Sequence, residues 1–329
     1  MKLSVYSPDE LAAALPHLLG FKPEKSVVFV PMSADLPIAR IDLPTTPRDR
    51  DAAWEAIRSP LGRYARPGAS MGIVCVTANR EEADRVVQDF AARLDTIGID
   101  TALMVWANDS EWHDYYLGES GYQTEAAREY VAAEMAPTGR PRPAASRASL
   151  ASSLVGDREP VAELLSEARE AAETTPPRAE AKWAVGRLRQ FHADGRPLSD
   201  RDAARLLVAV ETIPIRDRLW DDMTTDNADS HVALWTDLTR RAPDEVRSAP
   251  ASLLGLASWL SGDGAKALCA VEQVPRDSRY PLAGLVAAVV ESAMHPREWE
   301  SVKRIGQDAD FAAPQAGPRN NPVRPAPAL

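Results

Sequence analysis

The sequence contains few of the residues on which redox and metal chemistry depend. Its 329 residues include two cysteines and five histidines. Cys75 and Cys269 lie in apolar stretches far apart in the chain, and neither has a second Cys or a His at the spacing of a metal site. We therefore expect two buried free thiols rather than a disulfide. The sequence predicts no metal site.

Long hydrophobic runs and excess positive charge are missing as well. No stretch approaches the ~18 consecutive apolar residues of a membrane-spanning helix, and residues 1–8 lack the apolar core of a signal peptide. These absences predict a cytoplasmic protein without a membrane partner. The formal net charge is −10 and the pI is about 5.1, which is the wrong sign for a protein that binds phosphate backbones. Nucleic acid is therefore an unlikely partner.

Strong catalytic signatures are also absent. The sequence contains no G-x-x-x-x-G-K, G-x-G-x-x-G or H-E-x-x-H pattern, so it predicts no nucleotide cofactor. Residues 68–72 match the G-x-S-x-G pattern of a nucleophile elbow, which requires a strand before the serine and a helix after it. Here a Pro-Gly loop precedes Ser70 and a strand is expected after it. We interpret this match as loop residues that enter a strand. The sequence leaves open whether the protein is an enzyme, and the non-enzymatic interpretation is preferred because these signatures are missing.

What is present is an ordinary globular composition, with 45% hydrophobic and 26% charged residues over a length sufficient for two domains. The first helix is well delimited: Ser7 is a good N-cap, Pro8 and Glu10 suit the first turn, and Gly20 favours a left-handed end. Pro16 predicts a kink or a break. The expected strands cover residues 26–30, 38–43, 71–77 and 99–107, and the expected helices cover residues 48–58, 81–96 and 123–135, with a loop at 59–70.

These elements predict an α/β N-terminal domain over residues 1–135, a small mixed sheet with flanking helices. A Pro- and Arg-rich linker is expected over 136–147, because its prolines suit neither a helix nor a central strand. No convincing strand follows. Helical runs separated by Pro and Gly predict an all-α helical-hairpin C-terminal domain over 148–305, similar in style to tetratricopeptide hairpins. The Pro-rich residues 306–329 are expected to be disordered or extended.

Several motifs resemble the domain of unknown function 4192 family, which is typical of actinobacteria and their phages. In the N-terminal half these are Pro8-Asp9-Glu10-Leu11, Leu15 to Pro23, Ser26-Val27-Val28 and Ala39 to Pro44. In the C-terminal half they are Ile215-Arg216-Asp217, Leu234 to Leu238, Trp259 to Ala265 and Pro296 to Trp299. The resemblance covers roughly residues 3–303 and implies no established activity. Many members carry a cysteine-containing central segment, whereas residues 112–119 here contain no Cys.

Two pairs of polar residues are candidates for a ligand site. His113 and Asp114 follow the strand predicted at 99–107, and crevices at the carboxyl ends of parallel strands collect binding groups. The alternative is a packed aromatic loop over residues 108–122. Arg40 and Asp42 are two residues apart on a predicted strand and so share a face, where they form either part of a cleft or a surface ion pair.

Two further pairs are predicted to be structural. His231 and Trp235, at i and i+4, should form an aromatic packing contact on one face of a helix. Arg216 and Asp217 should tie neighbouring helices together. The leading hypothesis is thus a non-enzymatic protein-interaction or regulatory module that binds protein partners through its helical half, with possible self-association. The alternative is an enzyme or small-ligand sensor with a polar site built from Arg40, Asp42, His113 and Asp114.

Overall fold

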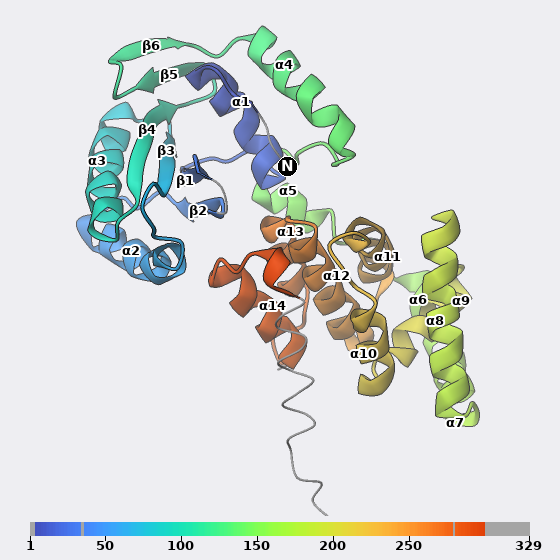
Figure 1. Ribbon diagram of the computed structural model, residues 1–329. Helices are drawn as coiled ribbons and strands as arrows, with labels where there is room; N and C mark the ends of the chain where they lie inside the picture. Colours follow the sequence, from blue (N-terminus) through green and yellow to red (C-terminus); the bar gives the residue numbers. More distant parts are fainter. Residues whose placement is uncertain (1–3, 34–35, 279, 300–329) are drawn as a thin grey trace, which may run out of the picture. The chain divides into compact units, whose positions relative to one another are not determined.

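The computed structural model describes residues 4–33, 36–278 and 280–299, and the tail predicted at 306–329 lies outside these residues. The N-terminal half is built around a six-stranded mixed sheet in the order β2-β1-β3-β4-β5-β6 (Figure 1). Its strands are β1 (Ser26–Pro31), β2 (Ala39–Asp42), β3 (Ser70–Val76), β4 (Asp100–Ala107), β5 (Glu111–Asp114) and β6 (Glu119–Tyr122). Only β3 and β4 pair in parallel; the other neighbouring strands are antiparallel. The predicted mixed sheet with flanking helices is confirmed.

Four helices flank this sheet: α1 (Pro8–Leu19), α2 (Pro47–Gly62), α3 (Arg80–Thr96) and α4 (Glu125–Met135). Helices α2 and α3 lie on one side of the strands, and α1 lies on the other, next to α4 (Figure 1). The main core lies under α2 and α3, where Phe29 of β1 meets Phe90 of α3 edge to face at 5.4 Å between ring centroids. Burial of this apolar surface is the largest favourable contribution to the folding free energy of the N-terminal half.

The predicted caps of α1 are confirmed. The Ser7 hydroxyl accepts a hydrogen bond from the Glu10 amide, and Gly20 ends the helix with a left-handed φ of 76°. Of the kink or break predicted at Pro16, the break does not occur, since α1 runs through this residue; the kink stays a prediction. The loop predicted at 59–70 begins too early, because α2 likewise continues past Pro60 to Gly62. In both helices the proline lies in the last turn. The backbone hydrogen bond that it cannot donate is therefore lost near the helix end, where the helix no longer has to continue far.

The aromatic loop predicted at 108–122 is in fact largely a β-hairpin. Strands β5 and β6 pair in antiparallel register, with Trp112 opposite Gly121 and His113 opposite Ser120. Strand β5 forms because it pairs with β4 and so extends the sheet. Its four polar and aromatic residues show no alternating pattern, so the sequence alone does not indicate a strand.

The described residues of the C-terminal half form helices joined by turns and loops, with no strand, and the sequence prediction of helices without strands is confirmed for them. Its helices are α5 (Arg147–Ser152), α6 (Glu159–Ala162), α7 (Leu165–Thr174), α8 (Pro177–Asp194), α9 (Asp200–Ala209), α10 (Ile213–Asp221), α11 (Ala228–Arg241), α12 (Ser248–Leu260), α13 (Gly264–Val271) and α14 (Pro281–Glu291). Short 3-10 turns cover Ala136–Thr138, Asp244–Val246 and Pro296–Glu298.

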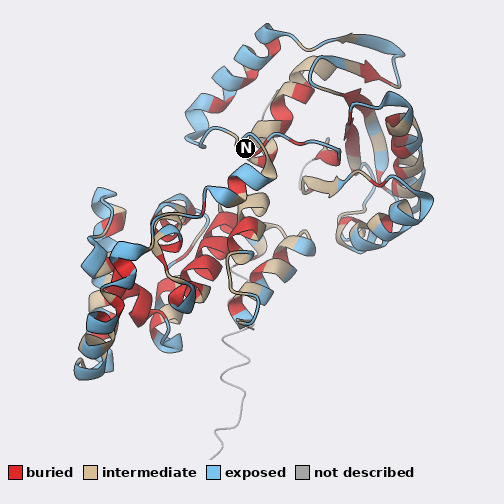
Figure 2. Cartoon of the chain, turned by 180° about the vertical axis from the view of Figure 1, so that it is seen from behind, coloured by how far each residue is buried: buried red, intermediate tan, exposed pale blue. Residues whose placement is uncertain are grey.

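Helix α12 forms the centre of this half and is buried around its whole circumference (Figure 2). It packs against α11, α13 and α14. A Cβ on Gly255 would meet side chains of Val271 in α13 and Val286 in α14 at 3.0 Å, so this small residue permits both helices to lie close to α12. The division into two domains at residues 135 and 148 stays a prediction. Among the described residues, no helix has both the length and the apolar character needed to cross a membrane.

Candidate functional site

The four residues predicted to form a ligand site lie as two separate pairs. Arg40 and Asp42 are on β2 at one edge of the sheet, whereas His113 and Asp114 are on β5, with β1, β3 and β4 in between. Nη1 of Arg40 lies 2.7 Å from Oδ1 of Asp42, whose side chain is 89% exposed. Arg40 also donates a hydrogen bond to Oγ of Ser26 at 2.9 Å. The structure therefore does not bring the two pairs together.

His113 and Asp114 each have a local structural partner. Nδ1 of His113 lies 2.9 Å from Oγ of Ser120 on β6. Oδ1 of Asp114 accepts hydrogen bonds from the backbone amides of Tyr116 and Leu117, at 2.8 and 3.1 Å, and so closes the turn between β5 and β6. These contacts account for the burial of both side chains. A ligand role for either pair stays a prediction.

A cleft of about 620 Å³ does lie at the carboxyl ends of the parallel strands β3 and β4, although other residues line it. Its floor includes Leu15 of α1 and the strand-end residues Val76 and Ala107. Its walls are α1, α4 and residues 142–145. Ligand pockets occur preferentially at such strand ends, and the volume lies within the range of small-molecule sites.

The walls of this cleft are held in place by hydrogen bonds. The amide of Lys22 donates to the carbonyl of Ala144, and the amide of Ala144 donates to the carbonyl of Gly20, both at 2.9 Å. At the other end, Oγ1 of Thr124 donates to Oδ2 of Asp9 at 2.7 Å and ties the start of α4 to the start of α1. The cleft is therefore preformed rather than dependent on a loop closing.

Charged side chains of both signs line the cleft. Lys22 is paired with Asp109 at 2.8 Å, and Arg128 with Glu125 at 3.0 Å. Within the described part of the chain, Arg142 and Glu129 line the cleft without a hydrogen bond or ion pair of their own. Burial lowers the pKa of His17, also in the lining, so this imidazole is neutral at pH 7. One cation and one carboxylate are thus available to a ligand.

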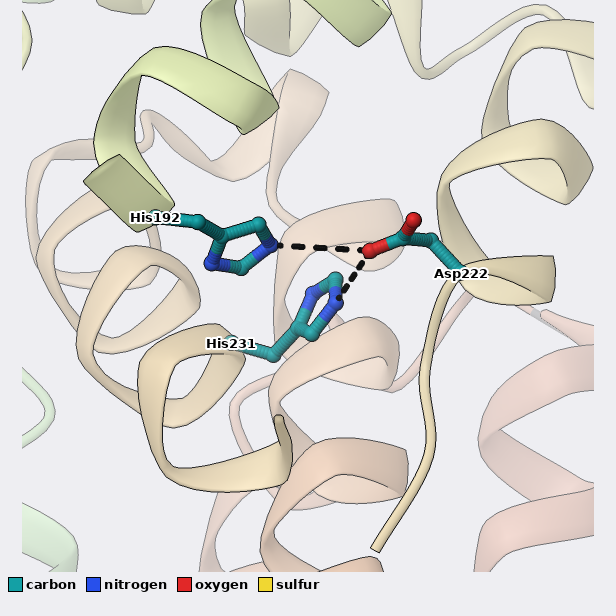
Figure 3. Close-up of side chains that lie close together, drawn as sticks. All are labelled: His192, Asp222 and His231. Atoms are coloured by element: carbon teal, nitrogen blue, oxygen red, sulfur yellow. Dashed lines mark hydrogen bonds and ion pairs between the residues drawn. The ribbon is translucent and has the colours of Figure 1, made fainter. Parts of the chain in front are cut away.

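A second polar cluster, in the helical half, brings together His192, Asp222 and His231 (Figure 3). His192 lies near the end of α8, Asp222 is the C-cap of α10, and His231 is in the first turn of α11. Oδ2 of Asp222 lies 3.2 Å from Nε2 of His231 and 3.6 Å from Nε2 of His192. The two imidazole rings meet edge to face, with 4.5 Å between their centroids.

Further hydrogen bonds orient each member of this cluster. Nδ1 of His192 lies 2.5 Å from Oγ of Ser230. Nδ2 of Asn227 donates to Oδ2 and to the backbone carbonyl of Asp222, at 3.3 and 2.8 Å. Trp235 donates its indole N–H to Nδ1 of His231 at 3.3 Å. Because an indole can only donate, Nδ1 of His231 accepts, and the neutral ring carries its proton on Nε2.

Burial sets the charge state of both histidines. His231 is fully buried, and desolvation, reinforced by the neighbouring His192, lowers the pKa of His231 to about 4. Burial also lowers the pKa of His192, against the opposing effect of Asp222. Both rings are therefore neutral at pH 7, and neutral imidazoles together with a carboxylate oxygen are ligands that metal ions use.

The sequence did not reveal this cluster. It predicted only the contact between His231 and Trp235, which the structure confirms and refines into a hydrogen bond between two buried rings. His192 is 39 positions from His231 on another helix, so no local spacing signals their meeting. The prediction that Arg216 and Asp217 link neighbouring helices is confirmed in part. Arg216 pairs with Asp217 in its own helix and donates a hydrogen bond to the hydroxyl of Tyr280, the residue before α14.

A family model described as "Domain of unknown function (DUF4192)" matches residues 8–297. Neither a curated protein nor a solved structure matches the chain.

Proposed function

The chain belongs to the DUF4192 family, whose description assigns no activity, and we propose a function from its own geometry. The α/β half binds a small zwitterionic molecule with an apolar body, of the amino-acid type, in the cleft at the carboxyl ends of β3 and β4. The observation that carries this proposal is a pair of opposite charges, Arg142 and Glu129, that have no partner among the described residues and lie on two walls of a preformed cleft with an apolar floor.

Each part of such a molecule has a complementary group in the cleft. A carboxylate fits the guanidinium of Arg142, which can donate two parallel hydrogen bonds. An ammonium group fits the carboxylate of Glu129. The apolar body fits against Leu15, Val76 and Ala107, where its surface is removed from contact with water. The sequence offered a small-ligand sensor as its alternative hypothesis, and this proposal agrees with it in kind. It places the ligand in a different site, away from Arg40, Asp42, His113 and Asp114.

Three probes with the same phenylethyl body test the charge preference: phenylalanine, 3-phenylpropanoate and 2-phenylethylamine. Ligand-observed NMR on the full chain should rank their affinities in that order. Arg142→Gln should weaken the binding of phenylalanine at least about tenfold, the loss expected for one charged hydrogen-bonding group. Arg48→Gln on α2 removes the same charge outside the cleft and should leave binding unchanged. Tightest binding of the amine, or no saturable binding of any probe, would contradict the proposal.

A steric test uses two neighbouring alanines on α4. Ala132 lines the cleft and Ala133 does not, and both are exposed. Ala132→Trp should abolish binding of phenylalanine because the indole fills the cleft, whereas Ala133→Trp should retain it. Equal effects of the two substitutions would place the binding site elsewhere.

The role of a non-enzymatic interaction or regulatory module stays a prediction, as do protein partners of the helical half. A ligand-binding α/β half fits the regulatory form of that role, since a ligand can shift the populations of conformations that a partner recognises.

A further inference from the structure

The cluster of His192, Asp222 and His231 lies in the helical half, outside the cleft of the proposed function. We propose that these three side chains bind a first-row divalent transition cation of the Zn²⁺ class. The ligand atoms are Nε2 of each histidine and Oδ2 of Asp222. Two imidazoles with one carboxylate suit Zn²⁺, Co²⁺, Ni²⁺ or Fe²⁺, whereas Mg²⁺ and Ca²⁺ prefer sites made of oxygen alone.

The spacing of the ligand atoms fits such a cation. Bonds of about 2.0–2.1 Å to a tetrahedral Zn²⁺ place neighbouring ligand atoms about 3.3–3.4 Å apart. Oδ2 of Asp222 lies 3.2 Å from Nε2 of His231 and 3.6 Å from Nε2 of His192, on either side of that value. The ligand atoms of all three residues lie within 4.8 Å of one another. A cation therefore needs only small side-chain movements to contact all three.

One ligand atom has an unmet bonding need that a cation would satisfy. Nε2 of His192 is buried and has no hydrogen-bond partner among the described residues, although it points toward the carboxylate of Asp222 (Figure 3). Buried polar atoms without partners are uncommon and call for an explanation. A shared cation provides one, because it accepts the lone pair of Nε2 and offsets the charge of Asp222.

The surroundings also suit a metal site. Nδ1 of His192 faces the hydroxyl of Ser230, which can accept a hydrogen bond from the N–H group and so fix the ring with Nε2 toward the cation. Asn227 holds the carboxylate of Asp222 by donating to the same oxygen. The Asp222 side chain is 45% exposed, so a cation can enter from solvent on that side and retain a water molecule.

Loading the site changes the hydrogen bond of one neighbour. In the cation-free protein Nε2 of His231 carries the ring proton, and Nδ1 accepts the N–H of Trp235. A cation on Nε2 displaces that proton, and the neutral ring then carries a proton on Nδ1. Two N–H groups would face each other, so the hydrogen bond from Trp235 must break. One proton leaves Nε2 and one is taken up on Nδ1, so the ring releases no net proton.

The test is a titration of the full chain, first stripped of metal by a chelator, with Zn²⁺ and with Co²⁺. We expect one ion of either kind per chain, and visible absorption bands of Co²⁺ with nitrogen and oxygen ligands. Asp222→Asn and His192→Gln should each weaken Zn²⁺ binding at least about tenfold, as losses at metal sites commonly do. His17→Gln in α1 is the matched control for adventitious binding to histidine and should leave the affinity unchanged.

Trp235→Phe separates a cation site from a purely structural hydrogen-bonded cluster. The substitution removes the N–H that opposes the loaded state, so it should tighten Zn²⁺ binding severalfold. It should also remove the fluorescence change that Zn²⁺ produces in the unsubstituted chain. Failure to bind Zn²⁺ or Co²⁺, or binding that Asp222→Asn and His192→Gln leave intact, would overturn the proposal. Loss of phenylalanine binding alone would refute the function proposed for the cleft and leave this site untouched.

Discussion

The indole of Trp112 lies against the backbone of Gly121, its partner across the β5–β6 hairpin. A Cβ at position 121 would lie 2.5 Å from Cζ2 of Trp112, which is closer than atoms of a real side chain come. Position 121 therefore needs a glycine because the Trp112 ring leaves no room for a side chain. The backbone does not require it, since the φ angle of Gly121 is not positive.

Gly121→Ala should therefore destabilise the protein by about 1–3 kcal/mol, the usual cost of inserting a methyl group where none fits. Thermal or urea unfolding measures the change. Gly186→Ala is the control, because a Cβ there meets no atom within 4 Å and the residue lies within α8. That substitution should stabilise the protein by about 0.5–1 kcal/mol through helix propensity. Equal effects of the two changes would contradict the assigned role of Trp112.

An ion pair between a half-buried arginine and a buried glutamate joins α8 to α9. Nε and Nη2 of Arg205 donate to the two carboxylate oxygens of Glu180, at 3.0 and 2.7 Å, and only 5% of the Glu180 side chain is exposed. Arg205→Leu leaves that carboxylate without its partner and should cost about 3–5 kcal/mol in the free energy of unfolding. The double variant Arg205→Leu/Glu180→Gln should recover part of the loss. A double variant as unstable as the single one would show that the unpaired charge is not the cause.

The two thiols should be unreactive in the folded protein. Cys75 and Cys269 are free and buried, as the sequence predicted. Burial raises the pKa of Cys75 to about 12 and that of Cys269 to about 11. Since the thiolate is the reactive form, very little of Cys75 is reactive at pH 8. Ellman's reagent should react slowly with native protein, faster as the pH rises, and rapidly with both thiols in denaturant. Fast reaction of the native protein at pH 8 would contradict this burial.

The start of α2 should show a pH-dependent cap. Thr46 and Asp49 form a capping box, and hydrogen bonds from Thr46 lower the pKa of Asp49. A carboxyl whose pKa is lowered by folding contributes stability above its unfolded pKa and loses that contribution as the pH falls through its folded value. Thr46→Ala should raise the pKa of Asp49 toward its ordinary value and lower the stability, most clearly at neutral pH. An NMR titration of Asp49 that is identical in both proteins would contradict the capping box.

Local signals account for what the sequence predicted correctly. The caps Ser7 and Gly20 delimit α1, and the apolar face from Ala83 to Leu94 delimits α3, because both depend on residues within one helix. The β5–β6 hairpin was missed because each strand has four residues and is fixed by its neighbours in the sheet. Long-range pairing of this kind leaves no periodicity to detect.

The candidate sites depend on tertiary placement even more strongly. The sequence predicted a ligand site after the strand that became β4, and a cleft does open at that strand end, but Arg142 lines it only because Ala144 pairs with Phe21, which follows α1. His113 and Asp114 are neighbours on one strand, so their side chains point to opposite faces. His192 and Asp222 come close to His231 only through the packing of three helices.

The most direct test of the central claim is a crystal structure of the full chain with phenylalanine. The account predicts electron density for the amino acid in the cleft at the ends of β3 and β4, with its carboxylate on Arg142 and its ammonium group on Glu129. A ligand bound outside that cleft, or a cleft that stays empty at saturating phenylalanine, would contradict it.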